Sequence, residues 1–453
     1  MAPATAAART ISQQAFDEMV QENVEDLGME PTDALEDAIQ TLTLQGVDLS
    51  GIVTCVPGEC NPVMECLGKL KEAKTLPEIV ELLDELCDLC RDKVLGNAAI
   101  AAKNGAVELV ISICSKLRDE CDRGLASALN ALASVIHDLQ SSEIFKENGG
   151  PKIIVGLLSR ERRDEKILGG CFSVIAAAAT GNEVLKESFM DLKIDDIIVQ
   201  IMKEHNGGSI PNIYDAIRVI LSSDDNRVVA SQGVYGYARK FAKLGIVEVL
   251  VDSLREGLSI PCLISASIAL KAVAVNDEIC RSIDCCGGLD VILRCLDDSG
   301  VRSNNAVARA FCSLLFKLAG SDMNKGTIVE MGGMDRLINL SARFSDDPSV
   351  LQEVMSTICT LCLRSPENAA RAVESGAGDL AIQAMHKFPD AEQLQRNSCF
   401  MIRNLVVRNP ENRKILLGNG IEELIRRAKQ NHKSCKAAAT DALRDLGVDN
   451  YNS

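Results

Sequence analysis

A seven-residue pattern recurs along most of this chain at intervals of 42 to 53 residues. It consists of a glycine, a small residue, an aliphatic residue, an acidic or polar residue, any residue and two aliphatic residues. Its eight copies begin at Gly105, Gly149, Leu192, Gly245, Gly287, Gly332, Gly376 and Asn419. A nearly constant period of this length is typical of a solenoid, in which each repeat is a small unit that stacks on its neighbours.

Each copy is expected to join two helices. Glycine can adopt the left-handed conformation that ends a helix without Cβ strain, and the acidic residue after it complements the positive end of the next helix dipole. A further segment in each unit, such as 125–136 or 309–320, has apolar residues at i, i+3, i+4 and i+7 and is predicted to be a third helix. Asn97, Asn324 and Asn368, eight residues before the glycine, are expected to cap the first helix.

This order of a short helix, a glycine turn and two longer helices resembles the armadillo repeat, whereas HEAT repeats lack the short helix and its turn. A closer resemblance, over nearly the whole chain, is carried by QQAFDEMVQENVEDLGMEPTDALEDAI, GVDLSGIV, LSSDDNRV, SCFMIRNLVVRNPEN and DALRDLG. These segments are similar to the armadillo repeat-containing protein 6 family. The resemblance implies an all-α fold: an armadillo-type right-handed α-solenoid of about eight repeats with an acidic helical N-terminal segment. It implies no known enzymatic chemistry and supplies no defined ligand.

The expected organisation has five parts. They are an acidic helical segment at 1–45, a linker at 46–62, a helical cap at 63–95, the repeat solenoid at 96–447 and a tail at 448–453.

The one long spacing, of 53 residues, indicates an insertion of about ten residues, which we place at 222–240. It holds Tyr235 and Tyr237, two of the four tyrosines of the chain. We expect a loop at a helix end beside the groove. Such a loop either carries function or is a tolerated surface insertion, and the sequence leaves both interpretations open.

Composition supports a helical, aliphatic core, because 47% of the 453 residues are apolar, only 3% are aromatic and there is no Trp. The net charge of −16 argues against nucleic-acid binding, which needs clustered Lys and Arg. No run approaches 18 apolar residues, so no membrane span is expected. No apolar leader opens the chain, so we expect reduced thiols and a cytoplasmic, possibly also nuclear, location.

The charge is unevenly distributed. Residues 1–95 hold 19 acidic and 6 basic residues, whereas 396–436 hold ten Lys and Arg against three Glu. The basic region is either a solvated end of the solenoid or a site for an acidic peptide. One hypothesis is that the acidic segment 11–45 docks on this basic end or competes with an acidic partner for it.

Cysteine motifs do not indicate a metal centre. Cys87 with Cys90 and Cys359 with Cys362 form two CxxC pairs, but the pairs are more than 260 residues apart. A structural zinc site needs two pairs close together, so these cysteines are interpreted as small core residues on apolar helix faces.

The more reactive thiols are expected at Cys55, Cys60 and Cys66, in or near the linker. An alternative function uses these N-terminal cysteines in a metal-dependent or redox regulator. Vicinal Cys285 and Cys286, just before a glycine turn, are expected to be buried.

No enzyme is predicted. The chain has no phosphate-binding GxxxxGK[ST] motif, no GxGxxG after a strand and no nucleophile elbow. Nothing singles out a pair of carboxylates for acid–base chemistry. Neither a cofactor nor a metal is expected.

In armadillo solenoids the third helices line the concave face, and nuclear-import receptors of this fold bind a basic peptide there with a Trp and Asn array. Aligned on their central aliphatic residue, the third helices place Ala131, Ala177, Val219, Ala272, Lys317, Thr360, Asn404 and Asp445 at the Asn position. Only Asn404 keeps the Asn, and the chain has no Trp, so the alternative of a nuclear-transport cargo receptor is disfavoured. The groove is expected to be apolar in the first four units and polar in the later ones.

The sequence therefore predicts a monomeric, non-catalytic scaffold or adaptor that binds a peptide or protein partner in the groove, with no nucleic-acid or membrane partner. The predicted partner-binding residues are Lys317, Thr360, Phe400, Arg403, Asn404, Arg444 and Asp445, with Tyr235 and Tyr237 at one side.

Overall fold

The computed structural model describes residues 9–49, 51–56, 60–91, 96–117, 122–160, 164–205, 208–227 and 231–452. Each of the five expected segments, and the insertion at 222–240, extends partly outside these residues. Two compact units make up the chain. The first comprises Met1–Ile198 and Ser222–Val234, and the second comprises Val199–Leu221 and Tyr235–Ser453.

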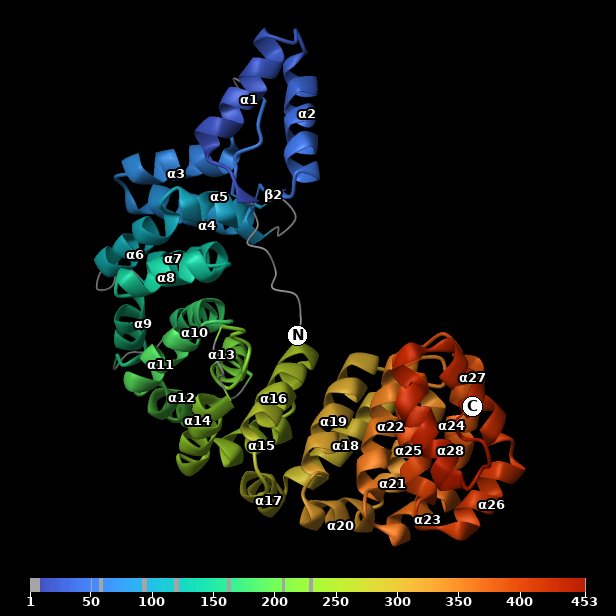
Figure 1. The fold of residues 1–453 in the computed structure, drawn as a ribbon. Coiled ribbons are helices and arrows are strands. Elements are labelled where there is room, and N and C mark those ends of the chain that lie inside the picture. Colours follow the sequence, from blue (N-terminus) through green and yellow to red (C-terminus); the bar gives the residue numbers. More distant parts are fainter. Residues whose placement is uncertain are drawn as a thin grey trace. The chain divides into compact units, whose positions relative to one another are not determined.

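The N-terminal part of the first unit is a helical hairpin, shown in blue in Figure 1. Its helices are α1 (Gln13–Glu25) and α2 (Pro31–Leu44), and they share a core of Phe16, Val20, Ala34, Leu35, Ala38, Leu42 and Ile52. The Ser12 side chain accepts a hydrogen bond from the backbone N–H of Ala15 and so caps α1. A two-residue parallel pairing, β1 (Arg9–Thr10) with β2 (Val47–Asp48), closes the base of the hairpin; Arg9 lies opposite Val47.

Helices α3 (Pro62–Glu72) and α4 (Leu76–Arg91) follow, and eight three-helix repeats come after them. The first three repeats are α5 (Asn97–Lys103), α6 (Ala106–Leu117) and α7 (Asp122–Val135); α8 (Leu139–Glu147), α9 (Gly150–Leu158) and α10 (Glu165–Ala179); and α11 (Glu183–Asp191), α12 (Ile194–Glu204) and α13 (Asn212–Ile220). The third helix α7 packs on α10, and α4, which precedes the repeats, packs on α7.

The other five repeats lie in the second unit, apart from the first residues of α14. They are α14 (Ser231–Lys243), α15 (Ile246–Arg255) and α16 (Ile260–Val273); α17 (Asp277–Cys285), α18 (Gly288–Val301) and α19 (Asn305–Leu318); α20 (Asp322–Glu330), α21 (Gly333–Arg343) and α22 (Pro348–Cys362); α23 (Pro366–Glu374), α24 (Ala377–Lys387) and α25 (Glu392–Val406); and α26 (Pro410–Gly418), α27 (Ile421–Asn431) and, after the 3-10 turn Lys433–Cys435, α28 (Lys436–Leu446). Helices α13, α16, α19, α22, α25 and α28 pack in series. The predicted all-α solenoid of about eight repeats is confirmed.

A left-handed residue joins the first two helices of every repeat. Gly105 and Gly245 have φ values of 81° and 89°, and in the copy without glycine Lys193 takes the role with φ of 62°. In the last copy the turn is at Gly420 rather than Asn419. The predicted glycine turn is therefore correct, and the third repeat shows that its geometry is retained without glycine.

Where two glycines follow each other, the second is constrained by space rather than by φ. A Cβ on Gly333 would lie 2.6 Å from both Cγ2 and the carbonyl oxygen of Ile328, whereas a Cβ on Gly332, with φ of 74°, would meet nothing within 4 Å. We expect Gly333→Ala to cost about 2–3 kcal/mol through overpacking, against about 1 kcal/mol for Gly332→Ala through its backbone conformation. Urea unfolding of the two variants measures this difference, and a larger cost at Gly332 would contradict it.

The prediction that Asn97, Asn324 and Asn368 cap the first helices is wrong; Asn182, Asn276 and Asn409 cap first helices instead. The helices that hold the three predicted asparagines begin after Gly96, Ser321 and Ser365. The asparagine amides instead donate to backbone carbonyls of Leu89 (from Asn97, 2.9 Å), Cys280 (from Asn324, 2.8 Å) and Leu361 (from Asn368, 2.9 Å). Each asparagine thus satisfies a carbonyl of a preceding helix, which the local sequence pattern does not reveal.

The insertion is not a loop throughout, because residues 231–243 form α14, the first helix of the fourth repeat. Tyr235 and Tyr237 lie on this helix, which is four residues longer than the nine-residue α17 or α20. Ala238 and Phe241 give it a fully buried side. The expectation of a tyrosine-bearing loop is therefore corrected: part of the added length extends a helix of the repeat.

Within the described ranges, no single helix is both long enough and apolar enough to cross a membrane. Helices α5 and α6 meet that test only as a pair bent by 75°.

Candidate partner-binding face

The third helices of the second unit each leave one stripe of side chains partly open to solvent. In α19 this stripe is Arg309, Ser313, Phe316 and Lys317, and the rest of the helix is mostly buried against its neighbours. Equivalent stripes on α16, α22, α25 and α28 follow the same i, i+3 or i+4, i+7 spacing. Because these helices pack in series, the stripes form one continuous surface, which we call the third-helix face.

Seven of the nine predicted partner-binding residues lie on this face. They are Lys317 on α19, Thr360 on α22, Phe400, Arg403 and Asn404 on α25, and Arg444 and Asp445 on α28. All are half-buried except Arg444, which is exposed. Tyr235 and Tyr237 are on a first helix instead and do not belong to it.

Four charged side chains at the end of the face satisfy one another. Arg403 lies 3.2 Å from Asp445 and 3.5 Å from Asp441, measured from guanidinium nitrogen to carboxylate oxygen. Arg444 makes contacts of 2.9 Å with Asp441 and 3.0 Å with Asp445. Two cations and two anions form a neutral cluster between α25 and α28, so Arg403 and Arg444 do not offer free charges to a partner.

Hydrogen bonds also link α25 to α22 across the face. The Asn404 amide donates to the backbone carbonyl of Cys359 at 2.9 Å, and the Asn397 amide donates to the Ser356 hydroxyl oxygen at 2.8 Å. Asn404, the one residue that matches the import-receptor array, is therefore used in holding two repeats together. This half-buried amide stabilises the stack, and it is already engaged before any partner arrives.

The cations that stay available are Arg309, Lys317 and Arg396. Among the residues that the structure describes, none of the three has a carboxylate within ion-pair distance. Arg396 lies over the Phe400 ring, 5.4 Å from its centroid. Phe316, 41% exposed on α19, adds an aromatic surface to the stripe that holds Arg309 and Lys317. Sequence reasoning missed Arg309 and Phe316, although both continue the stripe that contains Lys317.

Asp347 interacts electrostatically with Arg309 and Glu392 with Arg396. A further carboxylate near these cations is that of Glu353 on α22. Burial raises the pKa of its carboxyl, while Lys271 and Arg309 pull that pKa down. Lys271 itself donates to the Ser313 hydroxyl oxygen at 2.6 Å. The middle of the face thus has more cationic than anionic groups.

The expected apolar half of the groove is not supported at two of its four positions. Ala131 and Val219 are fully buried in their helix contacts, whereas Ala177 and Ala272 are half-buried. The alignment on a central aliphatic residue was off by one position at Ala131 and Val219, which therefore lie in the core. A helix turn has 3.6 residues, so the pattern does not determine which of two adjacent residues faces outward.

The comparisons with known proteins fit this fold. A family model described as ARMC6 matches residues 63–451, and the model of the armadillo repeat-containing protein 6 N-terminal domain matches residues 8–74. The chain belongs to the armadillo repeat-containing protein 6 family.

Individual proteins of the armadillo repeat-containing protein 6 family are also similar to this chain in sequence. Armadillo repeat-containing protein 6 of Homo sapiens is 29% identical over 391 residues, covering 80% of this chain and 75% of the relative. The homolog of Drosophila melanogaster is 27% identical over 383 residues, covering 80% of this chain and 79% of the relative.

Among solved structures, one titled for a phosphorylation switch that controls the interaction between cadherin and beta-catenin has a TM-score of 0.61 at 14% identity, covering 95% of this chain and 80% of that one. An engineered protein has a TM-score of 0.56 at 17% identity, covering 86% and 99%. These likenesses show the fold.

The cysteines are mostly core residues, as predicted for the CxxC pairs. Cys87, Cys90 and Cys362 are buried and Cys359 is half-buried, and burial raises the pKa of Cys90 to about 12. The expectation of a reactive Cys66 is wrong, because its thiol is 1% exposed and burial raises its pKa to about 11.

Other thiols differ in exposure. Cys60 is exposed and Cys55 is half-buried. Cys285 is exposed and Cys286 is half-buried, so the expectation that these two adjacent cysteines are buried is wrong. Over the described ranges, no three His, Cys, Asp or Glu side chains gather as metal ligands.

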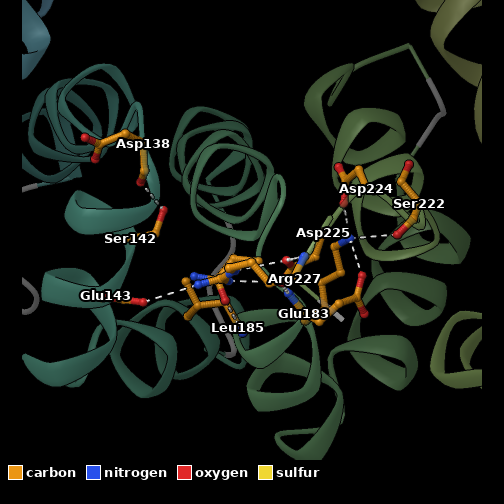
Figure 2. Close-up of polar contacts among 11 residues, drawn as sticks. Asp138, Ser142, Glu143, Glu183, Leu185, Ser222, Asp224, Asp225 and Arg227 are labelled. Carbon is orange, nitrogen blue, oxygen red and sulfur yellow. Dashed lines mark hydrogen bonds and ion pairs between the residues drawn. The ribbon is translucent and has the colours of Figure 1, made fainter. Parts of the chain in front are cut away.

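A buried ionic network, which sequence reasoning missed, holds the segment 222–227 on α11 (Figure 2). The Lys186 side chain is completely buried and pairs with Asp224 and with Glu183, the latter at 2.8 Å. Its Nζ also donates to the carbonyl oxygen of Ser222 at 2.7 Å. Ser222 and Asp224 are 36 and 38 residues from Lys186 in the chain, so no local motif predicts these two contacts.

Asp225 completes this attachment. Its carboxylate accepts two hydrogen bonds from the Arg227 guanidinium, at 2.9 and 3.0 Å, and one from the backbone N–H of Glu183 at 3.1 Å. Arg227 in turn lies 3.5 Å from Glu143 on α8 (Figure 2). These contacts fix the start of the insertion on two repeats of the first unit.

Asp225 makes the stability of the first unit sensitive to acid. Hydrogen bonding from Arg227 holds the pKa of this carboxyl well below its ordinary value. A lowered folded-state pKa stabilises the fold above the unfolded value of about 4 and loses that effect as pH falls further. We expect Asp225→Asn to reduce stability at pH 7 and to flatten its decline below about pH 4. Thermal unfolding from pH 7 to pH 2 measures both, and an unchanged acid slope would contradict the assignment.

Proposed function

We propose that this chain is a non-catalytic protein-interaction scaffold of the cytoplasm or nucleus, and that the third-helix face of its second unit receives a segment of a protein partner. The observation that carries the proposal is the division of polar groups on that face. Arg403, Arg444 and Asn404 are satisfied within the fold, whereas Arg309, Lys317 and Arg396 have no carboxylate within ion-pair distance in the described part of the chain.

The chemistry of the face favours a segment with acidic and apolar side chains. Arg396 over the Phe400 ring offers both a charge partner and apolar contact, and the exposed Phe316 adds apolar surface to the same face. The structural neighbour titled for the cadherin and beta-catenin interaction indicates that this fold supports protein binding. Neither observation favours the nuclear-transport or the cysteine-dependent alternative.

Crosslinking from defined positions tests the proposal. A photoreactive benzoylphenylalanine at Thr360, on the third-helix face, is compared with one at Met323, which is 68% exposed on the first helix α20. We expect a discrete crosslinked protein from Thr360 in cell extract, identified by mass spectrometry, and none from Met323. A crosslink from Met323 alone would place binding on the opposite side of the repeats and contradict the proposal.

A further inference from the structure

A deep cleft opens in the first unit between the N-terminal hairpin and the first repeat. Its volume is about 1010 Å³, at the upper end of the range for ligand pockets. One wall is α1, and the other is formed by residues 51–56, the start of α3 and the end of α5. The cleft is separate from the third-helix face, so the inference drawn from it does not rest on the proposed function.

The floor of the cleft is apolar. Phe16, Val20 and Val24 follow one another at four-residue intervals along α1 and line it. Phe16 and Val20 are buried in the hairpin core, but Val24 is half-exposed, as are Val56 and Met64 on the opposite wall. The half-exposed residues leave apolar surface that a bound apolar side chain would cover.

The rim along α1 is polar and acidic. Gln13, Asp17, Gln21 and Glu25 also follow at four-residue intervals and line the cleft. The Gln13 amide donates to Asp17 and the Gln21 amide to Glu25, each at 2.8 Å. Neutral amides hold these carboxylates, and within the described residues neither has a Lys or Arg at ion-pair distance. Lys103, at the end of α5, is the cation on the opposite wall. Residues 9–49 hold ten Asp and Glu against one Arg.

We propose that this cleft binds a short segment of a partner protein that places apolar side chains on the floor and Lys or Arg beside the α1 rim. The rim runs for about 18 Å, the length of the twelve-residue rise from Gln13 to Glu25 at 1.5 Å per residue. That length suits a linear peptide better than a compact small molecule. The negative charge of Asp17 and Glu25 selects a basic segment rather than an acidic one.

The probe is a fluorescein-labelled amphipathic dodecapeptide with leucines on one helical face and lysines on the other. Two matched peptides replace the lysines by glutamate or the leucines by serine. Fluorescence anisotropy with the full chain should show saturable binding of the first peptide, with both replacements weakening it about tenfold or more. Equal binding of the serine peptide would reduce the site to an acidic surface, and equal binding of the glutamate peptide would remove the charge argument; either result overturns the proposal.

Charge reversals on α1 provide matched variants. Asp17→Lys with Glu25→Lys changes two exposed rim residues, and Glu18→Lys with Glu22→Lys changes two exposed residues of the same helix that do not line the cleft. Both variants shift the net charge equally. We expect the rim variant to weaken peptide binding about tenfold and the control to leave it nearly unchanged. An equal effect of both variants would contradict a defined cleft site.

Two native thiols report occupancy directly. Cys55 and Cys60 line the cleft, whereas the exposed Cys285 lies in the second unit. Bound peptide should slow alkylation of Cys55 and Cys60 by iodoacetamide, read by mass spectrometry, and leave Cys285 unchanged. Unaltered alkylation at both cleft thiols under saturating peptide would place the peptide elsewhere.

Discussion

Replacing Lys186 by alanine is expected to lower the free energy of unfolding of the first unit by about 3–5 kcal/mol, because it breaks a buried ion pair by removing one partner. The Lys186 side chain is fully buried, and Glu183 beside it is 13% exposed. Without the ammonium group, Glu183 and Asp224 face each other with no cation, and the carbonyl of Ser222 loses its donor. Urea unfolding of the full chain, with hydrogen exchange in α11, measures the loss.

Lys325 provides the matched control. It occupies the same position as Lys186, seven residues before the left-handed turn residue of its repeat, and it donates to the carbonyl oxygen of Leu363 at 3.0 Å. Its acidic partner Asp322 is 84% exposed, so water can replace the lost ion pair. We expect Lys325→Ala to cost about 1–2 kcal/mol. Equal costs at the two lysines would show that the carbonyl contact, and not the buried ionic network, stabilises the repeat.

Reversing two charges on the third-helix face, Lys317→Glu with Arg396→Glu, is expected to weaken partner binding about 100-fold, or about 2.7 kcal/mol. In the part of the chain that the structure describes, neither cation has a carboxylate within ion-pair distance, so we expect their reversal to leave the fold intact and to turn attraction into repulsion. Arg403 is unsuitable for this test, because a glutamate there would face Asp441 and Asp445. Calorimetric titration with the partner that the crosslinking experiment identifies measures the change in affinity.

The control for this variant reverses two exposed cations away from the face, Arg302→Glu with Arg371→Glu. Arg302 follows α18 and Arg371 lies on the first helix α23. The net charge changes by the same amount, so long-range electrostatics are matched. If the control variant weakened binding as much as the reversal of Lys317 and Arg396, the partner would be attracted by overall charge and not by the face.

The repeat period made the fold predictable, because one local pattern fixes both the turn and the apolar side of the third helix. The same period placed Lys317, Thr360 and Arg403 on a common face without any structural information. What the period does not encode is which side chains pair between repeats. Arg403 with Asp445 and Asn404 with Cys359 are 42 and 45 residues apart, about one repeat. A search for complementary side chains at that separation would have found both pairs.

The insertion and the N-terminal cleft differ from expectation for two separate reasons. The length of the insertion at 222–240 and its position at a helix end predicted a loop, but Ala238 and Phe241 are fully buried on one side of α14. The N-terminal cleft depends on how residues 51–56 fold back on α1, where Gln13 and Val53 exchange hydrogen bonds at 2.8 and 3.1 Å. These contacts join residues 40 positions apart outside the repeat region, so the repeat period could not predict them.

Hydrogen–deuterium exchange of the full chain, with and without the partner that crosslinking identifies, tests the central claim most directly. If the third-helix face of the second unit binds the partner, protection should appear in α19, α22 and α25, and the first helices α20, α23 and α26 should exchange as before. Protection confined to the first helices, with α19, α22 and α25 unchanged, would contradict the assignment of this face as the binding site.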